Sequence, residues 1–235
     1  MSQINSLSDI TNNGLCIGCG ICQSLVGTDK ISISMSEKGR LEPKAIKPLS
    51  NLEFEKIKKT CPGVIVEGLP QTEVNNNSKH DLIWGYYNSL FYAWSTDKDI
   101  RFQSSTGGLL NGLSLYLLET NKVDFVLHTA GDPDNPMRSL PKFSYTKKDL
   151  LNCESRSRYG PASPLSRFNE ALDTNKKFVF VGKPCDISAI RQLSKIDERV
   201  NKQCLYLLTL CLLYTSDAAD ERSSVDLDGR RIIKK

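Results

Sequence analysis

Four cysteines of this chain are spaced like the ligands of a metal centre. Cys16, Cys19 and Cys22 recur at every third position in the segment GLCIGCGICQ, and Cys61 precedes a proline in TCPG. Three cysteines at this spacing with a remote Cys-Pro are typical of the ligands of one iron-sulfur cubane. The glycines between them let a short loop turn so that the sulfur atoms converge. We therefore predict a 4Fe-4S cluster on these four residues, and with it electron transfer.

The alternative is a structural zinc site, since four thiolates also suit tetrahedral zinc. Zinc sites usually consist of two C-x-x-C pairs, whereas a third cysteine three residues after Cys19 favours a cubane. A bacterial ferredoxin would place its Cys-Pro shortly after Cys22, and here Cys61 comes much later, so a single cluster closed by Cys61 is the economical solution. The isolated His80 and His128 are expected to be structural rather than ligands.

A second group of candidate residues forms the turn QSSTGG, before a helix with an apolar face. Small hydroxyl residues and paired glycines at a helix start leave N–H groups that suit an anion, typically the phosphate of a nucleotide cofactor. Serine and threonine are also ordinary helix caps. The candidate cofactor residues of this turn are Ser104, Ser105, Thr106, Gly107 and Gly108.

A third candidate is the turn VGKPCD, between the strand-like KFVFV and the helix-like DISAIRQL. Ligands of parallel α/β sheets gather at the carboxyl ends of strands. A cysteine beside Lys183 and a helix start is expected to have a lowered thiol pKa, which would make Cys185 reactive or metal-binding. The alternative is that Cys185 is a small buried residue at a tight turn. Tyr159 is either a cofactor contact or a loop anchor.

The elements that would position these residues alternate between strand and helix after a polar stretch. Short apolar strands between amphipathic helices predict an α/β sheet that is largely parallel. Before that stretch we expect a strand at 30–35 and a helix at 52–59 that leads to Cys61. After it, strands are expected at 90–95, 123–129, 177–181 and 204–210, and helices at 106–119, 164–172 and 186–193.

The fold class is therefore α/β (α+β), with a small cysteine-rich iron-sulfur module followed by a mixed, largely parallel α/β domain. The asparagine-rich EVNNNSKHD reads as a linker. The expected division is an iron-sulfur module at 1–70, a linker at 71–82, an α/β domain at 83–203, a further segment at 204–210, and a tail at 211–235.

Composition excludes several function classes. A net charge of +4 is not a nucleic-acid signature. No stretch approaches the roughly 18 apolar residues of a membrane helix, and the polar N-terminus lacks a signal-peptide apolar region. Clustered cysteines imply a reducing compartment. We expect a cytoplasmic protein without membrane insertion.

The tail looks unrelated to the rest of the chain. The strings CLLYTSDAADE and VDLDGRRIIKK have no hydrophobic period and resemble translated sequencing adapter. We therefore expect residues 211–235 to be non-native and the natural protein to continue differently after Leu210. Neither Cys204 nor Cys211 is assigned a role.

The motifs GLCIGCGIC, TCPG, QSSTGGLLNGLSLYLLE, SRYGPASPL and FVGKPCDISAIRQL occur together in an order and spacing that resemble the coenzyme F-420 hydrogenase/dehydrogenase beta-subunit family. The similarity runs from Gly14 to about Leu210. It implies that the α/β domain at 83–203 is a flavin-binding domain of the beta-subunit N-terminal type and that 204–210 begins a truncated C-terminal domain. It implies an oxidoreductase with FAD and one 4Fe-4S cluster, or two, that passes electrons between a redox partner and a substrate. In some members the substrate is a deazaflavin coenzyme.

The resemblance implies roles for each motif. Cys16, Cys19, Cys22 and Cys61 correspond to the cluster ligands, the turn 104–108 to the FAD contact, and the turn 182–185 to a residue set at the flavin or at a second cluster. The partners implied are a redox protein or deazaflavin-type coenzyme and a small-molecule substrate, which the sequence does not identify. The competing function is a non-catalytic electron-carrier or zinc-stabilised scaffold subunit of a larger complex.

Overall fold

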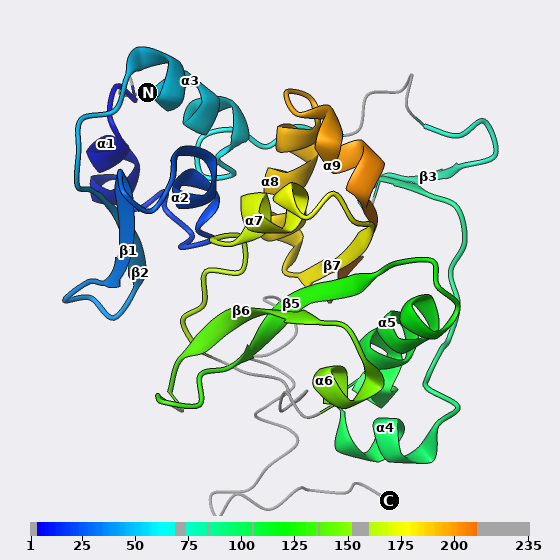
Figure 1. Cartoon of the computed structure of the whole chain (residues 1–235). Helices are drawn as coiled ribbons and strands as arrows, with labels where there is room; N and C mark the ends of the chain where they lie inside the picture. The colour runs from blue at the N-terminus through cyan, green and yellow to red at the C-terminus, as the bar shows by residue number, and fades with distance from the viewer. Residues whose placement is uncertain are drawn as a thin grey trace, which may run out of the picture.

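The computed structural model describes residues 4–68, 74–83, 85–104, 106–135, 137–151 and 160–210. Within them lie a cysteine-bearing N-terminal part, a small hairpin and a four-stranded sheet with helices on both faces (Figure 1). The predicted α/β class is confirmed. The expectation of a non-native tail at 211–235 concerns residues outside those ranges.

The N-terminal part contains three helices and one hairpin around its own apolar cluster. They are α1 (Leu7–Asn12), α2 (Ile21–Val26), β1 (Ile31–Met35), β2 (Leu41–Ala45) and α3 (Asn51–Thr60). Strand β1 and helix α3 confirm the predicted elements at 30–35 and 52–59. Ser50 caps α3, since its hydroxyl accepts from the N–H of Glu53 and the Glu53 carboxylate accepts from the N–H of Ser50. The cap fixes where the helix that delivers Cys61 begins.

The polar stretch is not a plain linker throughout. Strands β3 (Lys79–Asp81) and β4 (Gly85–Tyr87) pair as an antiparallel hairpin inside and just beyond it. His80 packs against the Tyr86 ring, with centroids 4.6 Å apart, which agrees with a structural role.

The strand predicted at 90–95 is wrong. These residues form no strand, and the side chains of Leu90 and Tyr92 are 91% and 100% exposed. The aromatic residues Phe91, Tyr92 and Trp94 favour extended backbone, but a strand also needs a hydrogen-bonded partner and a buried face. The segment instead lies against the turn that precedes a helix, because the Ser95 N–H donates to the Gly107 carbonyl at 2.8 Å.

The main sheet has the order β6-β5-β7-β8. Strands β5 (Phe125–Gly131), β7 (Phe178–Gly182) and β8 (Cys204–Thr209) are parallel, and β6 (Ser139–Ser144) is an antiparallel edge strand. The strands predicted at 123–129, 177–181 and 204–210 are confirmed with ends that differ by one or two residues. Strand β6 was not predicted, because its sequence SLPKFS carries a proline and little apolar periodicity.

Side chains alternate between the two faces of the central strands. Val126 and Val179 face one side, with α4 (Lys98–Gln103), α5 (Leu109–Glu119) and α6 (Lys147–Leu151). Phe125 and Phe178 face the other, with α7 (Phe168–Asp173), α8 (Pro184–Ser194) and α9 (Glu198–Gln203). Helices α5, α7 and α8 correspond to predicted helices with shifted starts, whereas α4, α6 and α9 were not predicted. Both faces of the sheet are therefore covered.

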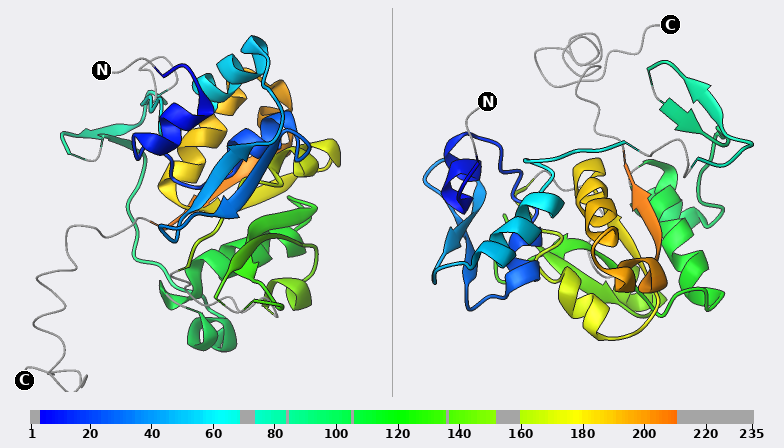
Figure 2. Two further views of the ribbon diagram at one scale, coloured as in Figure 1. Left: turned by 90° about the vertical axis from the view of Figure 1, so that its left-hand side faces the viewer. Right: turned by 90° about the horizontal axis from the view of Figure 1, so that it is seen from above.

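The cysteine-bearing part shares the core of this second face. Cys19 and Ile21 belong to the same buried cluster as Leu165, Phe168 and Ala189. Figure 2 shows the N-terminal part packed beside the α7 and α8 side of the sheet. The loop at 16–22 that carries three of the cysteines, called the cysteine loop below, therefore packs with the α/β domain as one unit.

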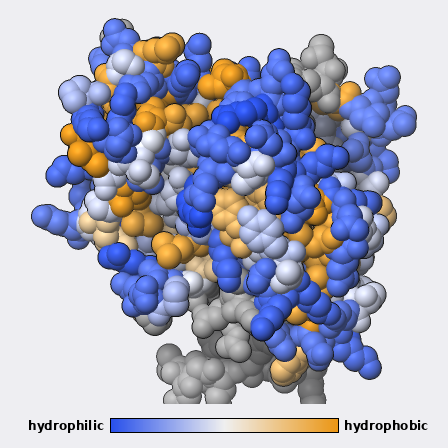
Figure 3. All heavy atoms as spheres, in the orientation of Figure 1, coloured by the Kyte–Doolittle hydropathy of each residue, from blue (hydrophilic) through white to orange (hydrophobic). Residues whose placement is uncertain are grey.

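On the face drawn in Figure 3, hydrophilic side chains predominate and apolar ones lie between them in smaller groups. Among the residues that the structure describes, no helix is long and apolar enough to cross a membrane.

Candidate functional site: a cysteine loop docked at the sheet

The loop that carries three of the cysteines turns through two left-handed glycines. Gly18 and Gly20 have φ of 70° and 87°. A Cβ on Gly18 would lie 2.7 Å from the Leu41 carbonyl oxygen, and one on Gly20 would lie 2.8 Å from the Ser166 nitrogen. Both positions therefore require glycine, by conformation and by close approach. The Gly18 N–H also points at the Cys16 sulfur, at 3.4 Å.

Cys61 is brought to this loop by the end of α3. It caps the helix, and its N–H donates to the Ile57 carbonyl at 2.8 Å. Two residues later Gly63 lies so close to the Leu15 carbonyl that a Cβ would overlap it. The TCPG turn and the start of the cysteine loop are in direct backbone contact.

Burial is the largest cause of the pKa shifts of all four thiols. It raises the pKa of Cys16, Cys19 and Cys61, and it raises that of Cys22 to about 12. The charges also act on one another, since Cys61 and Cys16 raise the pKa of Cys22 and Cys16 raises that of Cys61. Four neighbouring thiolates in such a place are costly without a cation. The donor set therefore fits a metal centre chemically.

The four thiols are free, and none is in a disulfide. Across the described ranges, no three Cys, His, Asp or Glu side chains converge as a ready set for a single metal ion. In a cubane each cysteine binds a different iron atom, so the sulfur atoms stand further apart than around one ion. The assignment of the four cysteines as cluster ligands stays a prediction.

Residues 163–169 hold the cysteine loop against the sheet domain through hydrogen bonds. The Ser163 hydroxyl donates to the Gly18 carbonyl at 2.7 Å, and the Leu165 N–H donates to the Cys19 carbonyl at 2.8 Å. These bonds satisfy buried carbonyl groups of the loop. They also fix the loop relative to β7 and α8.

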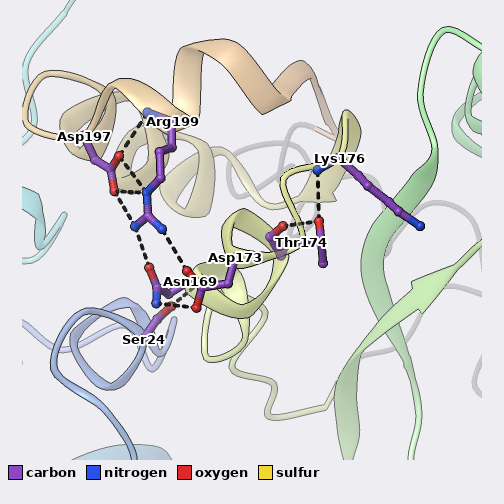
Figure 4. A network of polar contacts seen from close by, with 8 residues as sticks. Ser24, Asn169, Asp173, Thr174, Lys176, Asp197 and Arg199 are labelled. Carbon is purple, nitrogen blue, oxygen red and sulfur yellow. Dashed lines mark hydrogen bonds and ion pairs between the residues drawn. The ribbon is translucent and has the colours of Figure 1, made fainter.

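A network of polar contacts also joins α2 to α7 and α9 of the sheet domain (Figure 4). The Asn169 N–H donates at 2.7 Å to the hydroxyl of Ser24, which lies on α2, the helix that also carries Cys22. Arg199 donates to the Asn169 side-chain oxygen and to Asp173, each at 2.8 Å, and is held by Asp197. Sequence reasoning missed Arg199 because its partners Asn169 and Asp173 lie on α7, far away in the sequence.

The turn between β7 and α8 holds a buried acid that the sequence did not single out. Asp186 is 0% exposed, and its Oδ2 accepts from the Lys183 N–H at 2.9 Å and lies 3.3 Å from the Lys183 Nζ. Its Oδ1 has no hydrogen-bond partner among the described residues. Burial raises the pKa of Asp186, and the Lys183 charge opposes the shift.

The expected lowering of the Cys185 pKa is wrong. Burial raises the pKa of this half-buried thiol, and the Asp186 charge adds to the shift. Lys183 acts in the expected direction but more weakly. The helix start therefore does not lower the pKa of Cys185, because burial and then the neighbouring carboxylate outweigh the charge of Lys183.

A cavity of about 330 Å³ joins this turn to the cysteine loop. Cys16 and Lys183 both line it, together with Arg40 of the β1–β2 hairpin. The cysteine loop and the turn at 182–185, called the G-K-P-C turn below, are distant in sequence, and both line this cavity. Its other walls are Ile17, Gly18, Gly39, Leu41, Gly160, Pro161 and Ala162.

The QSSTGG turn has structural reasons for both glycines. Gly107 and Gly108 have φ of 64° and 70°, and a Cβ on Gly108 would lie 2.9 Å from the Ile100 carbonyl. The Ser104 hydroxyl accepts from the Asn111 side chain at 2.7 Å. Ser105, Tyr159 and the side chain of Thr106 lie outside what the structure describes.

The start of α5 nevertheless suits an anion in one respect. Its cap residue is Gly108, which has no side chain to bond the N–H groups of the first turn, and a helix start of this kind suits an anion. Helix α5 precedes β5 through a short connection and packs on β5 and β7. Its start therefore lies at the carboxyl edge of the strands, which is also the edge where α8 starts after β7 (Figure 2). Both candidate turns face one edge from opposite sides of the sheet.

Two other titratable groups lie apart from this edge. The His128 ring is 2.8 Å from the Ser144 hydroxyl, and burial lowers its pKa to about 4, as befits a structural histidine. Cys204 is buried at the start of β8, where burial raises its pKa.

Comparison with known proteins confirms the resemblance. Residues 90–168 match the family model described as coenzyme F420 hydrogenase/dehydrogenase, beta subunit N-term. This range includes the QSSTGG turn and ends in the segment that fastens the cysteine loop, but it includes none of the four cysteines.

Individual relatives agree. The chain is 30% identical over 114 residues to the coenzyme F420 hydrogenase subunit beta of Methanococcus voltae, covering 48% of this chain and 40% of that protein. It is 26% identical over 188 residues to a coenzyme F420-dependent sulfite reductase of Methanocaldococcus jannaschii, covering 80% of this chain and 26% of that protein. The chain thus spans less than half the length of these curated relatives.

A solved structure is also similar. It is a chain of the F420-reducing [NiFe] hydrogenase complex from Methanosarcina barkeri, with 24% identity, a TM-score of 0.44, and coverage of 60% of this chain and 53% of that one.

Proposed function

We propose, on the premise that residues 90–168 carry the beta-subunit N-terminal domain of the coenzyme F420 hydrogenase/dehydrogenase family, that this chain is part of an iron-sulfur flavoprotein oxidoreductase. The observation that carries the proposal is the docking of the cysteine loop. Ser163 and Leu165 hold the Gly18 and Cys19 carbonyls, and the same loop shares a cavity with Lys183.

Cys16, Cys19, Cys22 and Cys61 would hold one 4Fe-4S cluster. Such a cluster supplies one-electron transfer when bound. The chain contributes burial, the Gly18 N–H aimed at the Cys16 sulfur, and backbone contacts that allow little movement of the loop. Rigid donors keep the reorganisation cost of electron transfer low.

The flavin would lie at the carboxyl edge of the sheet, with its phosphates at the uncapped start of α5. A flavin supplies the exchange between two-electron and one-electron chemistry. Gly107 and Gly108 would leave the backbone N–H groups of this start accessible, while Lys183 and Cys185 approach the same edge from α8. We include Ser104, Ser105, Thr106 and Tyr159 in this proposed contact.

The relatives' names suggest the partners. F420-dependent hydrogenase, formate dehydrogenase and sulfite reductase share the F420 coenzyme and differ in the second substrate. We therefore propose that this chain exchanges electrons with a deazaflavin-type coenzyme or a redox protein, within a longer polypeptide or an assembly.

Iron and flavin stoichiometry tests the proposal. The full chain, purified anaerobically and reconstituted, is expected to bind about four iron atoms. Replacing any of the four cysteines by serine should lower the iron content, whereas Cys204→Ser, a buried cysteine outside the loop, should leave it unchanged. Stoichiometric zinc without iron would favour the scaffold function, and iron without flavin would favour an electron carrier.

A further inference from the structure

The buried carboxylate of Asp186 is the least expected charge in the described part of the chain. It is fully buried, one of its oxygens has no hydrogen-bond partner among the described residues, and its single ion-pair partner there is Lys183. Burying a carboxylate with an unsatisfied oxygen costs stability. A charge retained at this cost calls for a reason beyond packing.

The position of Asp186 supplies that reason. Asp186 lies in the first turn of α8, whose Ala189 and Ile190 pack in the same core cluster as Cys19. Its negative charge acts on the Cys19 thiol and on the Cys185 thiol. One carboxylate is therefore close enough to influence both the cysteine loop and the G-K-P-C turn.

Lys183 partly neutralises this charge from the solvent side. Its ammonium lies 3.3 Å from Asp186 Oδ2, and its side chain, 35% exposed, lines the cavity that Cys16 also lines. The pair is thus asymmetric. The carboxylate is buried and its charge acts on Cys19, whereas the ammonium is at the cavity wall.

We propose that Lys183 and Asp186 form a charge pair that sets the reduction potential of the cluster held by the cysteine loop. Reduction adds one electron, and hence one negative charge, to the cluster. A fixed negative charge nearby disfavours the reduced state, and a positive charge favours it. Asp186 therefore lowers the potential, and Lys183 raises it.

A second carboxylate acts in the same sense from another element. Glu42 on β2 raises the pKa of Cys16, so its charge also reaches the cysteine loop. Glu42 forms no ion pair with Lys183, which pairs with Asp186, so its contribution should be independent. It therefore does not alter the opposite signs expected for Lys183 and Asp186.

The test is a potentiometric titration of the anaerobic full chain with dithionite, followed by electron paramagnetic resonance. This inference rests on the proposed cluster, so iron content is measured first for each variant. Asp186→Asn keeps the shape and an acceptor for the Lys183 N–H but removes the charge, and it should raise the potential. Lys183→Gln leaves the Asp186 charge uncompensated and should lower it. Each shift should correspond to a change on the order of tenfold in the reduction equilibrium, or about 59 mV for one electron.

Three further variants separate tuning from structure. Lys183→Arg should keep the wild-type potential, and the double variant K183Q/D186N should return toward it. Lys195→Gln is the matched control, since Lys195 also pairs with a carboxylate, Glu67, but near the other end of α8, about 13 Å along the helix from Asp186. It should leave the potential unchanged.

The outcomes distinguish the two levels of the argument. Absence of iron in the wild-type protein would overturn both the proposed cluster and this inference. A normal iron content with the same potential in Asp186→Asn, Lys183→Gln and wild type would overturn the charge pair alone. If Asp186→Asn fails to fold, Lys183→Gln still tests the charge pair, because this variant keeps the buried carboxylate. A potential of Lys183→Gln that is not lower than that of the wild type would then overturn the charge pair.

Discussion

The Ser163 hydroxyl donates to the Gly18 carbonyl at 2.7 Å across 145 positions of sequence. Ser163 is buried, and the acceptor belongs to the loop between Cys16 and Cys19. One side chain of the sheet domain therefore helps to determine the shape of the cysteine loop.

Removing this hydroxyl should destabilise the protein. In Ser163→Ala the Gly18 carbonyl loses its donor while remaining enclosed, and the free energy of unfolding should fall by about 1–3 kcal/mol. Urea denaturation followed by circular dichroism measures the change. Ser194→Ala, which removes only an exposed local bond to Arg191, is the control and should cost less. Equal losses in the two variants would contradict the importance of the Ser163 bond.

The contact between Gly63 and Leu15 should be needed to bring Cys61 to the loop. A Cβ at position 63 would overlap the Leu15 carbonyl, so Gly63→Ala must push the TCPG turn away. We expect a lower iron content after reconstitution and a loss of stability of about 1–3 kcal/mol. Gly68→Ala is the matched control, because nothing lies within 4 Å of its added carbon. Normal iron binding by Gly63→Ala would show that the turn can move without cost.

Gly108 should be required by the fold itself, whether or not flavin binds. An alanine there would adopt a left-handed conformation, which costs about 1–2 kcal/mol, and would also press on the Ile100 carbonyl. Gly85→Ala, also left-handed but with nothing within 4 Å, isolates the first cost. Thermal unfolding without flavin should therefore show a larger loss for Gly108→Ala. Equal losses would mean that the contact with Ile100 is relieved at no cost.

His128 should make stability depend on pH. Its pKa is lowered to about 4 in the folded protein, against about 6.5 in an unfolded chain. The unfolded state therefore binds more protons between these values, and stability should fall as the pH falls from about 6.5 to about 4, by about 3 kcal/mol. The measurement is urea denaturation at several pH values. His128→Gln should show a shallower decline in this window, and an identical decline would exclude His128 as the cause.

Local sequence patterns predicted the elements whose burial follows from their own residues. KFVFV is a short apolar run between polar residues, and it forms the central strand β7, covered on both faces. LFYAWS has a similar composition, yet residues 90–95 form no strand, because no neighbouring strand accepts them. The difference between the two lies in partners elsewhere in the chain, which a local pattern does not contain.

Local patterns were also enough to locate the residues of the candidate site. The spacing of the cysteines and the sequences of the two turns identified these residues, but they did not predict how the residues lie relative to one another. The cavity that joins Cys16 to Lys183, the carboxylate of Asp186 and the anchor of Arg199 all depend on contacts between distant segments. The direction of the Cys185 pKa shift was predicted wrongly for this reason, since the burial of the thiol and the charge of Asp186 that raise this pKa both follow from packing.

The bond between Ser163 and Gly18 also has a consequence for biosynthesis. A ribosome adds about 5–20 residues each second, so residue 163 follows residue 18 by roughly 7–30 s. During this interval the newly made cysteine loop lacks the segment that covers it, and its thiols stand open to oxidants and stray metals. We expect productive loading of the site to await the second half of the chain, so that protection of the nascent thiols is a requirement of the order in which this polypeptide emerges.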